Sequence, residues 1–135
     1  MTDHQDPEEA SLMADPRFTE AVRLFNGRQW YACHDGFEEL WHETQGPCRP
    51  ILQGILQIAV AHHHLERGNL RGATVLLGEG IGRLRASGPS ALGFDLERLR
   101  QAAAARLRAL QHQENPLDEP CPCLDSAPAI PPATP

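Results

Sequence analysis

The stretch HDGFEELW at residues 34–41 decides how this part of the chain folds and where its polar groups point. Positions four and seven apart in an α-helix share a face, so His34, Glu38 and Trp41 point in the same direction. The only wide apolar stripe of the segment lies on the neighbouring arc. It consists of Trp30, Cys33, Phe37 and Leu40. The sequence therefore predicts an amphipathic helix that holds an imidazole and a carboxylate at the edge of a core.

Helical periodicity continues on both sides of this segment and is divided by capping and breaking residues. Asp15 and Pro16 form a helix start, because the carboxylate can cap the helix and proline fits its first position. Gly27, Gly46 and Gly68 follow expected helices and can end them. The predicted helices cover residues 16–26, 29–44, 50–67, 70–86 and 95–110. The predicted fold class is all-α, a single compact bundle of about five helices with disordered N-terminal and C-terminal tails.

Length and composition set the predicted domain organisation. A chain of 135 residues is long enough for one domain with one core. Aromatic residues make up only 5%, so the core must consist mainly of aliphatic side chains, which favours helices. We expect residues 1–14 to be a flexible arm, residues 15–112 to be the helical domain and residues 113–135 to be a Pro-rich disordered tail.

The charge of the chain bears on its partners. The formal net charge of -6 argues against nucleic acid. Residues 16–112, however, contain all 12 arginines and only nine of the 18 acids. Six arginines on the last two predicted helices form either a solvated surface or a basic face for RNA or an acidic partner, which leaves nucleic acid open. They are Arg83, Arg85, Arg98, Arg100, Arg106 and Arg108.

Cysteine spacing and the N-terminal sequence predict the cellular setting. The four cysteines have the spacing of neither a disulfide framework nor a zinc finger, and Cys121 and Cys123 fall in the expected tail. The acidic N-terminal residues lack the apolar stretch of a signal peptide. No apolar run reaches the roughly 18 residues of a membrane helix. We therefore expect a reduced, cytoplasmic protein without membrane contact.

Several blocks of this sequence together resemble one known family. The blocks are FNG at 25–27 with WY at 30–31, HDGFEELW at 34–41, QGILQIA at 53–59 and HLERGNLRGA at 64–73. They resemble DUF309, a bacterial and plastid family of unknown function, over about residues 17–110. The resemblance implies a small all-α bundle and brings no established activity. The chain departs from the family pattern at Asp35, Gly36 and His42, where the family usually has Glu, an aliphatic residue and Arg.

A second polar stripe lies on the predicted helix 50–67, where Gln53, Gln57 and His64 share a side. If helices 29–44 and 50–67 are antiparallel neighbours, as their short link suggests, the two polar stripes face each other inside the bundle. One interpretation is a closed hydrogen-bond network that fixes the packing, and the other is a ligand pocket. The full candidate cluster consists of His34, Glu38, Trp41, Gln53, Gln57, His64 and Asn69.

Two functional hypotheses follow from this cluster. The leading one is a small non-enzymatic binding or interaction domain that self-associates through exposed Leu and Ala. The alternative is a hydrolase-like enzyme, either an acid/base enzyme or one that binds zinc or iron through His34, Glu38 and His64. Because consecutive helical residues diverge by about 100°, the run 62–64 cannot hold one ion. We expect His62 to pack among isoleucines and His63 to be exposed.

Overall fold

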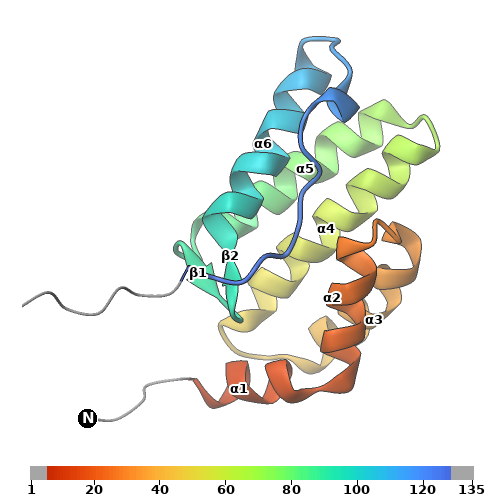
Figure 1. The fold of residues 1–135 in the computed structure, drawn as a ribbon. Helices are drawn as coiled ribbons and strands as arrows, with labels where there is room; N and C mark the ends of the chain where they lie inside the picture. Colours follow the sequence, from red (N-terminus) through yellow and green to blue (C-terminus); the bar gives the residue numbers. More distant parts are fainter. Residues whose placement is uncertain (1–5, 129–135) are drawn as a thin grey trace, which may run out of the picture.

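The computed structural model describes residues 6–128, and in this part of the chain six α-helices form one bundle with a small β-hairpin (Figure 1). This arrangement confirms the predicted all-α fold. The helices are α1 (Pro7–Ala14), α2 (Pro16–Asn26), α3 (Trp30–Glu43), α4 (Cys48–Glu66), α5 (Leu70–Arg85) and α6 (Leu96–Gln111). The strands β1 (Ser90–Ala91) and β2 (Phe94–Asp95) pair antiparallel, and a short helix, η1 (Pro116–Asp118), follows α6. Within residues 6–128, no helix has both the length and the apolar character needed to cross a membrane.

Three of the predicted helices, α2, α5 and α6, begin at the capping residues that the sequence indicates, whereas α3 and α4 have no side-chain cap at their start. The Asp15 side chain accepts a hydrogen bond from the Arg17 backbone N–H at 2.9 Å, and Asn69 caps α5 in the same way. Asp95 caps α6. Gly68, between α4 and α5, has a φ of 76°, a left-handed conformation that lets the chain reverse.

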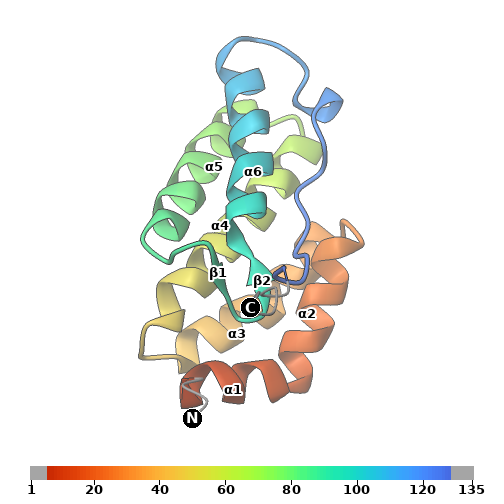
Figure 2. The same cartoon turned by 60° about the vertical axis from the view of Figure 1, so that its left-hand side comes forward.

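Helix α4 is the centre of the bundle, with ten buried residues. Helix α3 packs on one side of α4 with α2 packed on α3, while α5 and then α6 lie on the other side (Figures 1 and 2). Helices α4 and α5 approach most closely at two glycines. A Cβ atom at Gly80 would lie 2.9 Å from the backbone oxygen of Gly54, so only glycine permits this crossing.

The structure differs from the expected N-terminal arm, because residues 7–14 form α1. Asp6 caps this helix and Pro7 occupies its first turn, which is the same start signal as in α2. The Glu8 carboxylate accepts hydrogen bonds from the backbone N–H groups of Gly46, at 2.7 Å, and Cys48, at 2.8 Å. Helix α1 is therefore held against the start of α4 by contacts that its weak apolar pattern does not reveal.

The structure also differs from the expected C-terminal tail, because residues 113–128 pack along the bundle. This C-terminal segment runs back from α6 toward β2, between α6 and α2 (Figure 2). The Asn26 side chain forms hydrogen bonds of 3.1 and 2.7 Å with the backbone of Leu124, whose side chain is buried. Phe94 and Ser126 form an antiparallel bridge. The predictions for residues 1–5 and 129–135 lie outside the described residues.

Candidate functional site

The predicted contact between His34 and Glu38 forms, but at the surface. The Nε2 atom of His34 lies 3.3 Å from a carboxylate oxygen of Glu38, as their spacing on α3 predicts. The side chains are 32% and 44% exposed, so this pair is not part of the core. His34 also contacts Asp35 at 3.3 Å and lines a surface hollow of about 200 Å³ beside Tyr31 and Val60.

The other predicted cluster residues turn toward different neighbours. The Gln57 side chain accepts a hydrogen bond from Arg83 at 2.9 Å and donates one to Glu79 at 3.0 Å. Gln57 therefore faces α5. His64 contacts Asn69 within the turn between α4 and α5, at 3.3 Å. Gln53 is half-buried on α4.

Trp41 packs beneath the Arg49 guanidinium, 4.2 Å from the ring centre. Its indole nitrogen is buried and has no hydrogen-bond partner among residues 6–128. Trp41 therefore contributes to the packing at the end of α3 rather than to a shared polar cluster.

The prediction of a buried cluster in which the polar sides of α3 and α4 meet is therefore wrong. The two helices instead bring together apolar side chains such as Phe37 and Ile55, because burying ionisable groups without partners is costly. The proposed ligands His34, Glu38 and His64 do not converge. Within residues 6–128, no three His, Cys, Asp or Glu side chains are placed to hold a metal ion.

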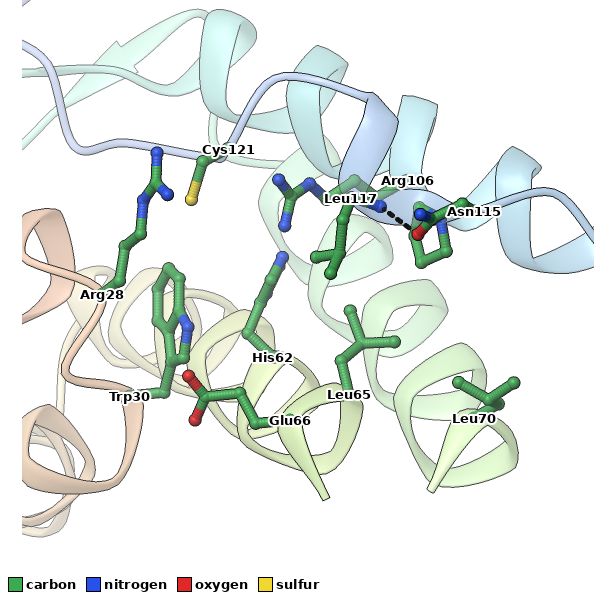
Figure 3. Close-up of a pocket in the computed structure, with 11 residues that line it drawn as sticks. Arg28, Trp30, His62, Leu65, Glu66, Leu70, Arg106, Asn115, Leu117 and Cys121 are labelled. Atoms are coloured by element: carbon green, nitrogen blue, oxygen red, sulfur yellow. Dashed lines mark hydrogen bonds between the residues drawn. The ribbon is translucent and has the colours of Figure 1, made fainter. Parts of the chain in front are cut away.

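A different pocket, of about 360 Å³, opens where the turn before α3, the ends of α4 and α6 and the C-terminal segment meet (Figure 3). Its polar wall contains His62 from α4 and Arg106 from α6, which point toward one another. The Trp30 ring closes another side, with its centre 4.7 Å from that of His62.

His62 has one unpaired, buried nitrogen, and its side chain points toward Arg106 across this pocket (Figure 3). The residue is 1% exposed, which confirms the prediction of a packed histidine. Its Nδ1 lies 2.8 Å from the backbone oxygen of Ile58, and because a carbonyl only accepts, Nδ1 carries the proton. In the neutral ring, Nε2 is then a hydrogen-bond acceptor, and it has no partner among residues 6–128.

Burial keeps this imidazole neutral. Desolvation lowers the pKa of His62 to about 4, the hydrogen bond to Ile58 opposes the shift, and the positive charge of Arg106 adds to it. At neutral pH the pocket therefore contains an uncharged acceptor that lacks a donor. His63, in contrast, is half-buried against the Tyr31 ring, more covered than expected.

Arg106 joins the bundle to the C-terminal segment. It is 5% exposed, and its Nε and one terminal nitrogen donate to the backbone oxygens of Pro120, at 3.2 Å, and Glu119, at 2.9 Å. Burial lowers the pKa of Arg106, Cys121 opposes this shift, and the positive charge of Arg28 adds to it. The two guanidinium groups thus lie close enough to repel each other.

Arg28 stands at the opposite end of this pocket wall, beside Cys121 (Figure 3). Its φ of 62° is left-handed, an uncommon conformation outside glycine that the tight turn before α3 imposes. The Arg28 guanidinium forms no hydrogen bond or ion pair with any residue in the range 6–128. Its charge is therefore available at the pocket.

The rim of the pocket is mixed, because polar Arg28, Glu66 and Asn115 and apolar Leu70 and Leu117 are all exposed there. Leu70 is 55% exposed and Leu117 is 66% exposed, and both line the pocket together with Leu65. Glu66 contributes the single carboxylate among the described lining residues and lies on the Trp30 side (Figure 3). The site can accept a ligand that has a polar head and an apolar body.

Sequence reasoning missed this pocket because its residues come from four distant segments. The sequence pattern places Arg106 on a basic helical face and Cys121 in a C-terminal tail. Part of that basic face serves internal contacts: Arg83 binds Gln57, and Arg100 donates to the backbone oxygen of Leu84 at 2.9 Å. The available signal was His62, because a polar ring on an isoleucine-rich face requires partners.

Residues 18–76 match the model of the family described as Domain of unknown function (DUF309). This match confirms the resemblance over residues 18–76. No curated protein matches the chain. The matched region includes Arg28, Trp30 and His62, whereas Arg106 and Cys121 lie beyond it.

Proposed function

We propose that this protein is a binding domain that takes a small organic ligand in the pocket between α4, α6 and the C-terminal segment. The unpaired Nε2 of His62 carries the proposal. A buried acceptor without a donor costs on the order of 1 to 3 kcal/mol, and a ligand that supplies the donor recovers this energy. The volume of about 360 Å³ is within the range of small-molecule sites.

The charge state of His62 favours binding over catalysis. A general base works best when its pKa lies near the operating pH, and a pKa of about 4 makes His62 a weak base at neutral pH. It is better suited to accept one hydrogen bond from a bound molecule. The domain is therefore proposed to recognise its ligand rather than to convert it.

The enzymatic alternative has one contact in its favour, the His34–Glu38 pair at 3.3 Å. This pair is solvent-exposed, and His64 contacts Asn69 instead of joining it. The remaining hypotheses, self-association and a basic face for an acidic partner, stay predictions. Exposed Leu70 and Val75 on α5 support the first of them.

The two tryptophans allow a direct test by NMR, because Trp30 lines the pocket and Trp41 does not. In a screen of small organic compounds, we expect binders to shift the indole N–H signal of Trp30 and leave that of Trp41 unchanged. Replacement by His62→Phe should remove or weaken these shifts, whereas His63→Gln, the adjacent position outside this pocket, should preserve them. Binders that act equally on both variants, or no shift of Trp30 by any compound, would contradict the proposal.

A further inference from the structure

We propose that the pocket ligand is a 2-hydroxycarboxylate with an apolar tail, bound with its carboxylate between Arg28 and Arg106 and its hydroxyl on His62. This inference rests on the proposed function and names the chemistry of its ligand. The three polar groups line the same pocket as Leu65, Leu70 and Leu117 (Figure 3).

The charge of the pocket favours an anion. Arg28 and Arg106 both line it, and their guanidinium groups repel one another. Arg28 has no acidic partner among residues 6–128. With His62 neutral, the single lining acid, Glu66, leaves an excess positive charge, and a carboxylate between the two arginines would offset it.

Arg106 is placed to bind such a group without releasing its present contacts. Its Nε and one terminal nitrogen hold the backbone oxygens of Pro120 and Glu119. The other terminal nitrogen makes no hydrogen bond to residues 6–128 and carries two N–H donors. The arginine can therefore hold the C-terminal segment and a ligand oxygen at the same time.

A carboxylate alone cannot complete the site, because it only accepts hydrogen bonds and the Nε2 of His62 also accepts. The ligand must supply a donor next to its anionic group. A hydroxyl fits this need, whereas a protonated amine would bring a positive charge toward Arg28 and Arg106. Because His62 and Arg106 point toward one another, we place the donor on the carbon next to the carboxylate (Figure 3).

The apolar part of the ligand has a matching surface. Leu65, Leu70 and Leu117 line the pocket, and the side chains of Leu70 and Leu117 are more than half exposed. Covering them with an alkyl chain removes apolar surface from water. The polar side chains Arg28, His62 and Arg106 and the leucines that line the same pocket thus favour an amphipathic molecule.

Three eight-carbon probes separate the two head-group requirements: 2-hydroxyoctanoate, octanoate and 1,2-octanediol. Octanoate lacks the hydroxyl donor, and the diol lacks the charge. We expect the hydroxy acid to bind the full chain at pH 7.5 about tenfold more tightly than either of the others, the scale of one lost hydrogen bond. Calorimetry gives each Kd. Because Trp30 also lines the hollow beside His34 and His63, a Trp30 indole shift that weakens in His62→Phe assigns the binding to the proposed pocket.

Two variants assign the contributions. In Arg28→Gln, which changes an exposed side chain, the hydroxy acid should lose its advantage over the diol. In His62→Phe, the hydroxy acid should lose its advantage over octanoate. The control Arg108→Gln changes an exposed arginine of α6 outside the pocket and should leave all three affinities unchanged.

The possible failures are distinguishable. If the diol or octanoate binds at Trp30 as tightly as the hydroxy acid, or only unrelated compounds shift Trp30, the ligand class is wrong and the binding function stands. If neither the probes nor a compound library shifts Trp30, both proposals fall. Tight binding of the hydroxy acid that is insensitive to Arg28→Gln overturns the assignment of the carboxylate.

Discussion

His62 should make the stability of this protein depend on pH in a range where carboxylates contribute little. Its pKa is about 4 in the folded protein because burial disfavours the charged ring, whereas the ordinary value is 6.5. As the pH falls below 6.5, the unfolded chain therefore takes up a proton that the folded protein does not. The stability contribution of the neutral ring is complete above pH 6.5 and is lost as the pH falls toward 4.

The size of the effect follows from the separation of the two pKa values. Each pH unit between them costs about 1.4 kcal/mol of unfolding free energy. The loss should reach about 2 kcal/mol at pH 5 and about 3 kcal/mol below pH 4. A domain of this size has a total unfolding free energy of roughly 5 to 15 kcal/mol, so the loss is measurable.

Urea denaturation between pH 8 and pH 5, on the wild type and on His62→Phe, isolates this contribution. Phenylalanine can still pack against Trp30 but cannot take up a proton. Other titrating groups are present in both proteins, so their effects cancel in the difference between the two curves. The stability of the wild type relative to the variant should fall by about 2 kcal/mol over this range. A difference that stays constant within about 0.5 kcal/mol from pH 8 to pH 5 would refute the buried, neutral imidazole.

Four further substitutions test individual contacts. Arg106→Gln should lower the unfolding free energy by about 2 kcal/mol and speed alkylation of Cys121, because two hydrogen bonds to the C-terminal segment are lost; an unchanged labelling rate would argue against that role. Gly80→Ala should destabilise by about 1 to 3 kcal/mol, while Gly78→Ala, where nothing lies within 4 Å, should stabilise by up to about 1 kcal/mol; equal melting temperatures would contradict the close crossing. Glu38→Gln should change stability by less than about 0.5 kcal/mol, since its side chain is 44% exposed, and a larger loss in chemical denaturation would indicate a buried partner.

Helix boundaries were predictable because they depend on local chemistry. Asp15 and Asp95 cap the helices that follow them, and the positive φ of Gly68 ends α4 where the sequence indicates. Helix α1 had the same start signal but only one buried apolar residue, Leu12. Its stability depends on contacts such as Glu8 with the start of α4, which no local pattern shows.

The site was less predictable because periodicity fixes the faces of one helix but not the rotation of two helices relative to each other. The pair His34 and Glu38 lies within one helix and forms as expected. The stripes that were expected to meet belong to two helices, and each turned to another neighbour, as Gln57 did toward α5. The partner of His62 across the pocket, Arg106, is 44 residues away in the chain, beyond the reach of any local pattern.

The location of the pocket determines how its specificity is divided along the chain. The matched region, residues 18–76, supplies the positive charge of Arg28. It also supplies the Nε2 of His62, which can accept a hydrogen bond from a donor on the ligand. The second cation, Arg106, and the wall that includes Leu117 come from beyond this region. Because Arg106 also fixes the C-terminal segment, a ligand oxygen bound to it is linked to the position of that wall. Ligand selection should therefore depend on Arg106 and Leu117 as much as on the residues of the matched region 18–76.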